Sequence, residues 1–295
     1  MTTVSNEGDF SSLSASQFLL EALDQRWKNY RAELRRCREE FSNEAVHDLR
    51  SAARRMLAII QLLDFLSPQP RLQKLNRAFK DQLDEFDDLR DTQVILAEIS
   101  ESVQELPQLQ RFQEYLQQRE KRLLKRLRKK LKVIDLFDVS KRIRGLRSSL
   151  KRAPTSNGRF VKQVVQAVDA TFLITKQRKN WIYPAQAASI HRVRLAFKTF
   201  RYMVEIVHPL LHDFPSTNLR SMHDYQSLMG EIQDVEVIMQ ALAEAPSEIL
   251  AASAEPVKRY YERCHAEAIS CYMESMDRLD TFWRAAPDQP FPWEK

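Results

Sequence analysis

Glycine and long apolar runs are both scarce in this chain. Only four of its 295 residues are glycine, whereas average usage is about 7%. Apolar residues recur at helical spacing almost throughout, and no segment shows the strict alternation of a half-buried strand. The prolines lie mostly between these periodic segments, where they end or begin helices. We therefore predict an all-α fold.

Cysteine is also rare, and no targeting or membrane segment is evident. Cys37, Cys264 and Cys271 form neither a paired framework nor a metal-binding spacing, and they are typical of a reducing compartment. The opening sequence, MTTVSNEGDFSSLSAS, lacks the basic and then apolar order of a signal peptide. No apolar run approaches the roughly 20 residues of a membrane span. We predict a soluble cytoplasmic protein without membrane insertion.

Basic charge is plentiful but unevenly distributed. The net charge is only +6, yet residues 111–162 hold 18 lysines and arginines against four acids. Such a concentration favours a polyanionic partner. The candidates are nucleic acid, an anionic membrane surface and polyphosphate.

The periodic segments predict eight main helices in two sets of four. The first set covers about residues 14–41, 44–67, 71–102 and 107–151, the last with a break near 133–138. The second set covers about residues 160–181, 185–207, 217–243 and 246–283. The Pro-, Ser-, Asn- and Gly-containing segment RAPTSNGR at residues 152–159 separates the sets. We predict two tandem four-helix bundles, 14–153 and 154–286, between a flexible N-terminus (1–13) and a C-terminal tail (287–295).

Three basic residues share one side of the helix expected at residues 44–67. At about 100° per residue, His47, Arg50 and Arg54 lie within roughly 60° of one another. Apolar residues such as Leu49 and Met56 take the opposite side. On its own, this pattern marks a solvated face more often than a binding site.

The same stripe occurs a second time. His191, Arg194 and Lys198 repeat the spacing 144 residues later, and Arg201 adds one further cation on the same side. The segment FDDLRDTQVIL also matches MGEIQDVEVIM at an offset of 143, which places Asp91 over Asp234. Two landmarks in one order predict an internal duplication. Packing with approximate two-fold symmetry would place both stripes around one basic central cavity.

These repeated segments resemble the CHAD family, a histidine-bearing α-helical domain. VHDLRSAARR and IHRVRLAFKTFRY are similar to its His-x-x-Arg-x-x-x-Arg/Lys helix, and LRDTQV and GEIQDVEV to its Gly-x-x-Arg-Asp-x-Asp-Val motif. The resemblance covers about residues 13–283. It implies two helical bundles around a basic central cavity, binding of inorganic polyphosphate, and a location at polyphosphate granules.

The two copies depart from the family pattern at different positions. In the first copy, Asp87 stands in place of glycine and Gln93 in place of aspartate. Leu57 occupies the position that matches Arg201. In the second copy, Gln233 replaces the motif's arginine. We therefore expect two unequal walls.

Polyphosphate has no base to recognise, so its site needs rigid, repeated cations. Arginine offers a planar fork for phosphate oxygens and lysine a point charge, and one helical turn spaces them about 5 Å apart. Residues 119–132 add nine cations beside a narrow apolar seam. Asp91 and Asp234 are expected to orient nearby arginines. The expected ligand contacts are His47, Arg50, Arg54, Arg119, Arg122, Arg126, His191, Arg194, Lys198 and Arg201.

One alternative function is a metal-dependent phosphohydrolase of the His-Asp type. The pairs His47-Asp48, His212-Asp213 and His223-Asp224 suggest it. His191 and Asp277 or Asp280 would be the additional ligands. However, His223 corresponds to Lys80 in the first copy, so the repeat does not preserve a ligand there. Because no nucleophile, nucleotide loop or cofactor motif is evident either, we expect no catalysis, no metal and no cofactor.

Two non-catalytic alternatives remain open. The basic stretch suits a non-specific nucleic-acid-binding protein, but no recognised module or basic patch studded with stacking aromatics is evident. A helical scaffold without a polyanionic ligand is the other.

Overall fold

The chain folds entirely into helices over the residues that the structure describes. The computed structural model describes residues 15–152, 157–250 and 254–294, and no strand occurs within them, which confirms the all-α prediction. In these same ranges, no helix has the length and apolarity needed to cross a bilayer. The helices of the first half are α1 (Ala15–Glu39), α2 (Asn43–Leu66), α3 (Pro70–Asp84), α4 (Asp87–Ser102), α5 (Gln110–Val133) and α6 (Phe137–Lys151). Those of the second half are α7 (Asn157–Asn180), α8 (Ala187–Val207), α9 (Asn218–Glu244), α10 (Ser247–Leu250) and α11 (Ala254–Ser275).

Two expected helices are interrupted. The single helix predicted over residues 71–102 is wrong, because α3 ends at Asp84 and α4 begins at Asp87. Neither glycine nor proline marks this break; Phe86, at the start of α4, is buried in the core instead. The helix expected over 246–283 is also divided, into α10, α11 and a 3-10 helix at Met276–Thr281. The break expected near 133–138 is confirmed, since α5 ends at Val133 and α6 starts at Phe137.

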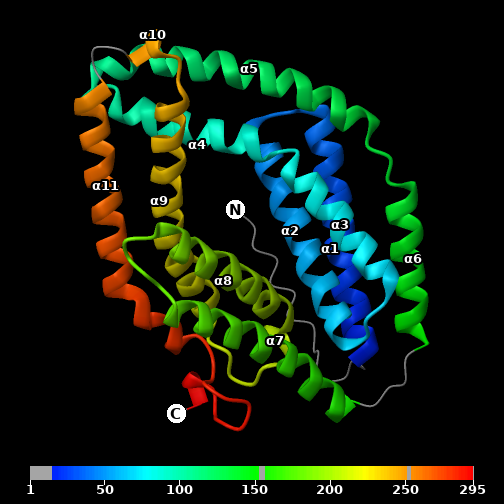
Figure 1. Ribbon diagram of the computed structural model, residues 1–295. Helices are drawn as coiled ribbons and strands as arrows, with labels where there is room; N and C mark the ends of the chain where they lie inside the picture. The colour runs from blue at the N-terminus through cyan, green and yellow to red at the C-terminus, as the bar shows by residue number, and fades with distance from the viewer. Residues whose placement is uncertain (1–14, 153–156, 251–253, 295) are drawn as a thin grey trace.

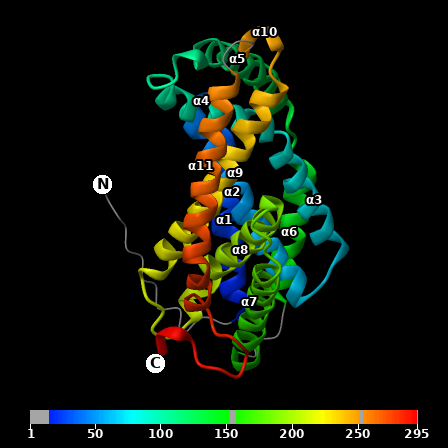
Figure 2. The same cartoon turned by 60° about the vertical axis from the view of Figure 1, so that its left-hand side comes forward.

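The two halves meet along several pairs of helices. Figure 1 shows α5 as a long rod that lies beside α4, with α6 turned away from it toward α1 and α3. In the second half, α7 packs against α8, and α9 packs against α11. Between the halves, α2 contacts both α7 and α8, and α4 contacts α9 (Figures 1 and 2). Smaller contacts of α5 with α10 and of α1 with α7 also join them.

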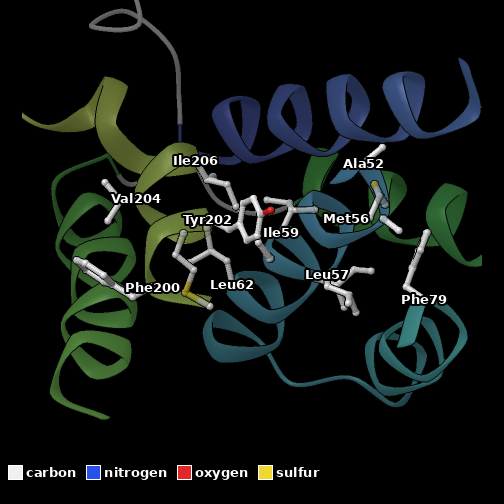
Figure 3. Close-up of a cluster of buried hydrophobic side chains, with 14 of the residues drawn as sticks. Ala52, Met56, Leu57, Ile59, Leu62, Phe79, Phe200, Tyr202, Val204 and Ile206 are labelled. Carbon is white, nitrogen blue, oxygen red and sulfur yellow. The ribbon is translucent and has the colours of Figure 1, made fainter. Parts of the chain in front are cut away.

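One main hydrophobic core spans both halves. Figure 3 shows Met56 and Ile59 of α2 in the same buried cluster as Tyr202 and Ile206 of α8. A second, smaller cluster joins α4 and α5 to α9 and α11, and includes Ile99. The main core therefore crosses the boundary expected near residue 153. The duplication, its two-fold symmetry and the domain limits stay predictions.

The terminal and linker predictions fall partly outside the described residues. Residues 1–13, expected to be flexible, lie outside them, as do residues 153–156 of the expected linker. The remaining linker residues from Asn157 belong to α7. The C-terminal tail packs on the main core: the Phe291 ring stacks on Trp293 at 4.6 Å and meets the edge of Trp283 at 4.8 Å.

A buried carboxylate fastens this tail to the second half. Asp169 of α7 accepts hydrogen bonds from Trp283 Nε1 at 2.8 Å and from Arg284 Nε and Nη2 at 2.9 and 2.6 Å. Asp169 is 5% exposed. The bidentate geometry and the low exposure both strengthen the ion pair.

We expect Asp169→Ala to lower the free energy of unfolding by roughly 3 kcal/mol, because the guanidinium of Arg284 is left with no buried partner. Urea denaturation followed by circular dichroism measures this. Glu262→Ala, which removes an exposed pair with Lys258 on α11, should change stability by less than about 0.5 kcal/mol. Similar losses in both variants would contradict a structural role for Asp169.

Candidate functional site

The packing of α2 against α8 brings the two basic stripes together. Arg54 of α2 lies close enough to Arg194 and Lys198 of α8 for their charges to repel. We call these three residues the central cation cluster. All three side chains are partly buried, and this burial is the largest influence on each pKa. Two helices that are distant in the sequence thus contribute to one concentration of positive charge.

The central cation cluster is not neutralised by the protein. Among the described residues, Arg54, Arg194 and Lys198 take part in no hydrogen bond and no ion pair; the Nε of Arg194 is buried without a partner. Asp234 of α9 stabilises the charge of Arg194 from beyond ion-pair distance. Buried cations in proteins are normally paired. Three neighbouring basic side chains without an ion-pair partner are therefore suited to bind an external anion.

Burial, and to a smaller extent neighbouring positive charge, lowers the pKa of each member. Burial lowers the pKa of Lys198 to about 6, with the charges of Arg54 and Arg194 acting in the same direction. Burial likewise lowers the pKa of Arg54 to about 10, and Arg50 contributes to this. At neutral pH the two arginines are therefore charged, whereas Lys198 is mostly neutral.

Arg50 and Arg201 lie beside the cluster but are already engaged. Arg50 is 4% exposed; its Nη1 donates to the Leu83 carbonyl at 3.0 Å and its Nη2 to Asp87 Oδ1 at 2.8 Å. It thereby satisfies a carbonyl at the break between α3 and α4. Arg50, which was expected to contact the ligand, thus stabilises the structure around the site.

Arg201 is held on α8 by three neighbours. Its Nη1 donates to Glu205 Oε1 at 2.6 Å and its Nε to Gln226 Oε1 at 3.0 Å. Its guanidinium also lies 4.6 Å from the centroid of the Tyr202 ring. The Leu57 position, its counterpart on α2, has no cation, so the two walls differ as their sequences do.

The two histidines lie at the same ends of the two stripes. Burial lowers the pKa of His47, and the charges of Arg90, Arg54 and Arg50 lower it further. His191 is partly buried, and its Nδ1 has no hydrogen-bond partner among the described residues. Both imidazoles are therefore available to an anion at the edge of the cluster.

Helix α4 adds a cation that was not predicted from the sequence. Arg90 of α4 interacts electrostatically with His47 and Arg194. It also acts on both expected orienting acids, lowering the pKa of Asp91 and of Asp234, although burial leaves both pKa values raised. The signal was present, because Arg90 immediately precedes Asp91 in LRDTQV.

The expected α5 contacts are placed differently. Arg119 is partly buried, while Arg122 and Arg126 are exposed. Arg126 lines a pocket of about 200 Å³ together with acids of α3 and α4, among them Asp84 and Asp88. No interaction found among the described residues joins these three arginines to the central cation cluster. Their role, and the basic cavity itself, stay predictions.

The acids proposed for a metal site have another partner. Asp277 Oδ1 and Asp280 Oδ2 each accept a hydrogen bond at 2.8 Å from Nζ of Lys179, whose side chain is 8% exposed. Within the described ranges, no three His, Cys, Asp or Glu side chains gather closely enough to hold a metal ion. The phosphohydrolase alternative therefore gains no support from this geometry.

Comparison with known proteins decides the family. The family model described as CHAD domain matches residues 18–243, which include both stripes and both acidic motifs. The chain belongs to the CHAD domain family. The fold of this CHAD domain is similar to the crystal structure of the CHAD domain from the plant Ricinus communis, with a TM-score of 0.66 and 19% sequence identity over 91% of this chain and 90% of that chain. No curated protein matches this CHAD domain.

We expect Lys198→Met to raise the free energy of unfolding by roughly 1 kcal/mol, because burying an apolar chain costs less than burying an amine among arginines. Thermal and urea denaturation measure the change. Arg50→Met, which removes a fully engaged side chain of the same face, should instead destabilise the protein by roughly 3 kcal/mol. A loss of stability in Lys198→Met would contradict the view that the cluster is electrostatically strained.

Proposed function

We propose that this CHAD domain binds inorganic polyphosphate, without catalysis, at the central cation cluster. The observation that carries the proposal is a set of three partly buried basic side chains at the junction of α2 and α8, which form no hydrogen bond and no ion pair within the described residues. A polyanion with closely spaced charges compensates all three at once, which a single carboxylate does not. Family membership supports the same ligand, because CHAD domains are linked to polyphosphate in general.

The residues of the proposed site have different roles. In this proposal, Arg54 and Arg194 grip phosphate oxygens with planar guanidinium forks, and Lys198 adds a point charge between them. Arg50 and Arg201 keep α2 and α8 in place through their own acceptors. His47 and His191 offer imidazole N–H groups to phosphate oxygens, and Arg90 adds a positive charge on α4.

The wider features of the proposal follow from the family resemblance. We infer a basic cavity between two bundles related by duplication, and a cytoplasmic location at polyphosphate granules. Arg119, Arg122 and Arg126 of α5 are proposed as outer contacts for a long chain. Asp91 and Asp234 are proposed to orient the arginines near them, Asp234 chiefly Arg194 and Arg90.

We expect Arg54→Ala/Arg194→Ala/Lys198→Ala to reduce the affinity for long-chain polyphosphate by about 100-fold or more, since charge-assisted phosphate contacts are each worth about 1.5–3 kcal/mol. Isothermal titration at roughly 50 and 200 mM salt measures the affinity and its salt slope, which should fall by about 2–3 with the lost cations.

The matched control removes equal charge from an exposed helix. Lys258, Arg259 and Arg263 of α11 pair only with neighbouring glutamates on their own helix. Lys258→Ala/Arg259→Ala/Arg263→Ala should lower the affinity by less than about threefold. If the two triple variants lose affinity equally, net charge alone governs binding and the central site is refuted.

Binding should also consume a proton, because bound phosphates raise the pKa of Lys198 from about 6 toward its ordinary value. Free Lys198 is neutral above pH 6 and bound Lys198 is charged, so affinity should increase as pH falls from about 9 to 6. Titration at pH 7.5 in two buffers of different ionisation enthalpy measures the uptake, expected near one proton.

Lys198→Arg separates this effect from binding itself. Because arginine keeps its proton in proteins, this variant should bind polyphosphate at pH 7.5 with little proton uptake. The pKa of His47 is lowered as well, so His47→Gln serves as the second control and should keep the uptake at pH 7.5. An undiminished uptake in Lys198→Arg would show that another group titrates.

A further inference from the structure

A basic pocket lies on α5, apart from the central cation cluster. Its volume is about 550 Å³, and its lining consists of Phe41, Leu124, Lys125, Arg128, Lys129 and Lys132. The five α5 residues recur at intervals of one, three, one and three positions, so they share one face of that helix. Phe41 comes from the short connection between α1 and α2. The pocket is therefore formed by one helical face and one aromatic residue.

All the charged side chains that line this pocket are positive. Among the described residues, its four cations form no ion pair and no hydrogen bond with another side chain. Other cations of α5 behave differently: Lys130 pairs with Glu85, and Arg126 lies among the acids of α3 and α4. The four cations that line this pocket with Phe41 thus have no acid among the pocket residues, unlike Lys130 and Arg126.

The apolar part of the pocket is unusual for a solvated basic face. Phe41 has a φ of +46°, in the left-handed region that bulky residues rarely adopt. Its partly buried side chain packs against the main core and also lines the pocket. Leu124 adds a second apolar wall. An aromatic side chain held in an unfavourable backbone conformation beside four free cations indicates a function for that position.

We propose that this pocket binds single-stranded nucleic acid, with one base stacked on Phe41 and the flanking phosphates on Lys125, Arg128, Lys129 and Lys132. A base has an aromatic face that Phe41 and Leu124 accept, and its backbone has the charge that the four cations compensate. Inorganic polyphosphate would engage the cations but leave Phe41 uncovered. A duplex keeps its bases stacked inside, where Phe41 does not reach them.

The decisive comparison keeps charge constant and removes the bases. Fluorescence anisotropy of the full chain is measured with labelled oligo(dT) of twelve nucleotides and with an abasic deoxyribose-phosphate chain of the same length. We expect oligo(dT) to bind about tenfold more tightly, as base–aromatic stacking provides. Equal affinities would show that the pocket is only a cationic surface and would overturn the proposal.

Substitutions then assign the two contributions to residues. Phe41→Leu keeps an apolar side chain but removes the aromatic face, so oligo(dT) affinity should fall to the abasic level while abasic binding is unchanged. Lys125→Gln/Lys129→Gln should weaken both probes by about tenfold. The matched control Arg111→Gln/Lys121→Gln, on exposed α5 positions outside the pocket lining, should cost less than threefold. An oligo(dT) preference that survives in Phe41→Leu would refute stacking on Phe41.

Two cross-tests separate this pocket from the polyphosphate site. Arg54→Ala/Arg194→Ala/Lys198→Ala should keep its oligo(dT) affinity, and Phe41→Leu should keep its polyphosphate affinity. Loss of oligo(dT) binding in the central triple variant would place the nucleic acid at the central cation cluster and overturn the proposal. The nucleic-acid proposal can thus be refuted while the polyphosphate proposal stands, and the polyphosphate proposal can be refuted while the nucleic-acid proposal stands.

Discussion

The arrangement of the site depends on one buried guanidinium, that of Arg50. Its two hydrogen bonds reach the Leu83 carbonyl at the end of α3 and the Asp87 carboxylate at the start of α4. The last turn of a helix leaves carbonyl groups without intrahelical partners. At this break the Leu83 carbonyl accepts hydrogen bonds from Phe86 N and from Arg50 of α2, both at 3.0 Å. This contact fixes the direction in which α4 leaves the break. It therefore positions Arg90 and Asp91 beside the stripe of α2.

From this frame, the basic residues of α2 and α8 take two different roles. Arg50 and Arg201 have protein acceptors and contribute to the fold. Arg54, Arg194 and Lys198 have none among the described residues, and placing these basic groups together in a partly buried site lowers the stability of the protein. Each basic stripe thus contains both a side chain that stabilises the fold through protein acceptors and a side chain that has no such acceptor among the described residues. The distinction lies in which side chain meets an acid, such as Asp87 or Glu205, from another turn or another helix.

Much of this organisation could be predicted from sequence, and the failures have specific causes. Apolar periodicity and scarce glycine predicted the helices, and the repeated His-x-x-Arg spacing identified the residues that α2 and α8 bring together. The break at Phe86 was missed because a long-range contact with Arg50 stabilises it, and local sequence has no signal for that. Periodicity also cannot tell an engaged arginine from a free one, since Asp87 lies 37 positions from Arg50. The position of Arg126 near the acids of α3 and α4 likewise depends on how α5 lies across them.

The hydrophobic core that α2 and α8 share has a consequence for synthesis of the chain. When only the first half has left the ribosome, Met56 and Ile59 of α2 have no Tyr202 or Ile206 to pack against. At that stage Arg54 is still a solvated cation, since Arg194 and Lys198 do not yet exist. The central cation cluster therefore forms only after α8 has been synthesised, so a translation product truncated before α8 carries the first histidine motif but not the cluster.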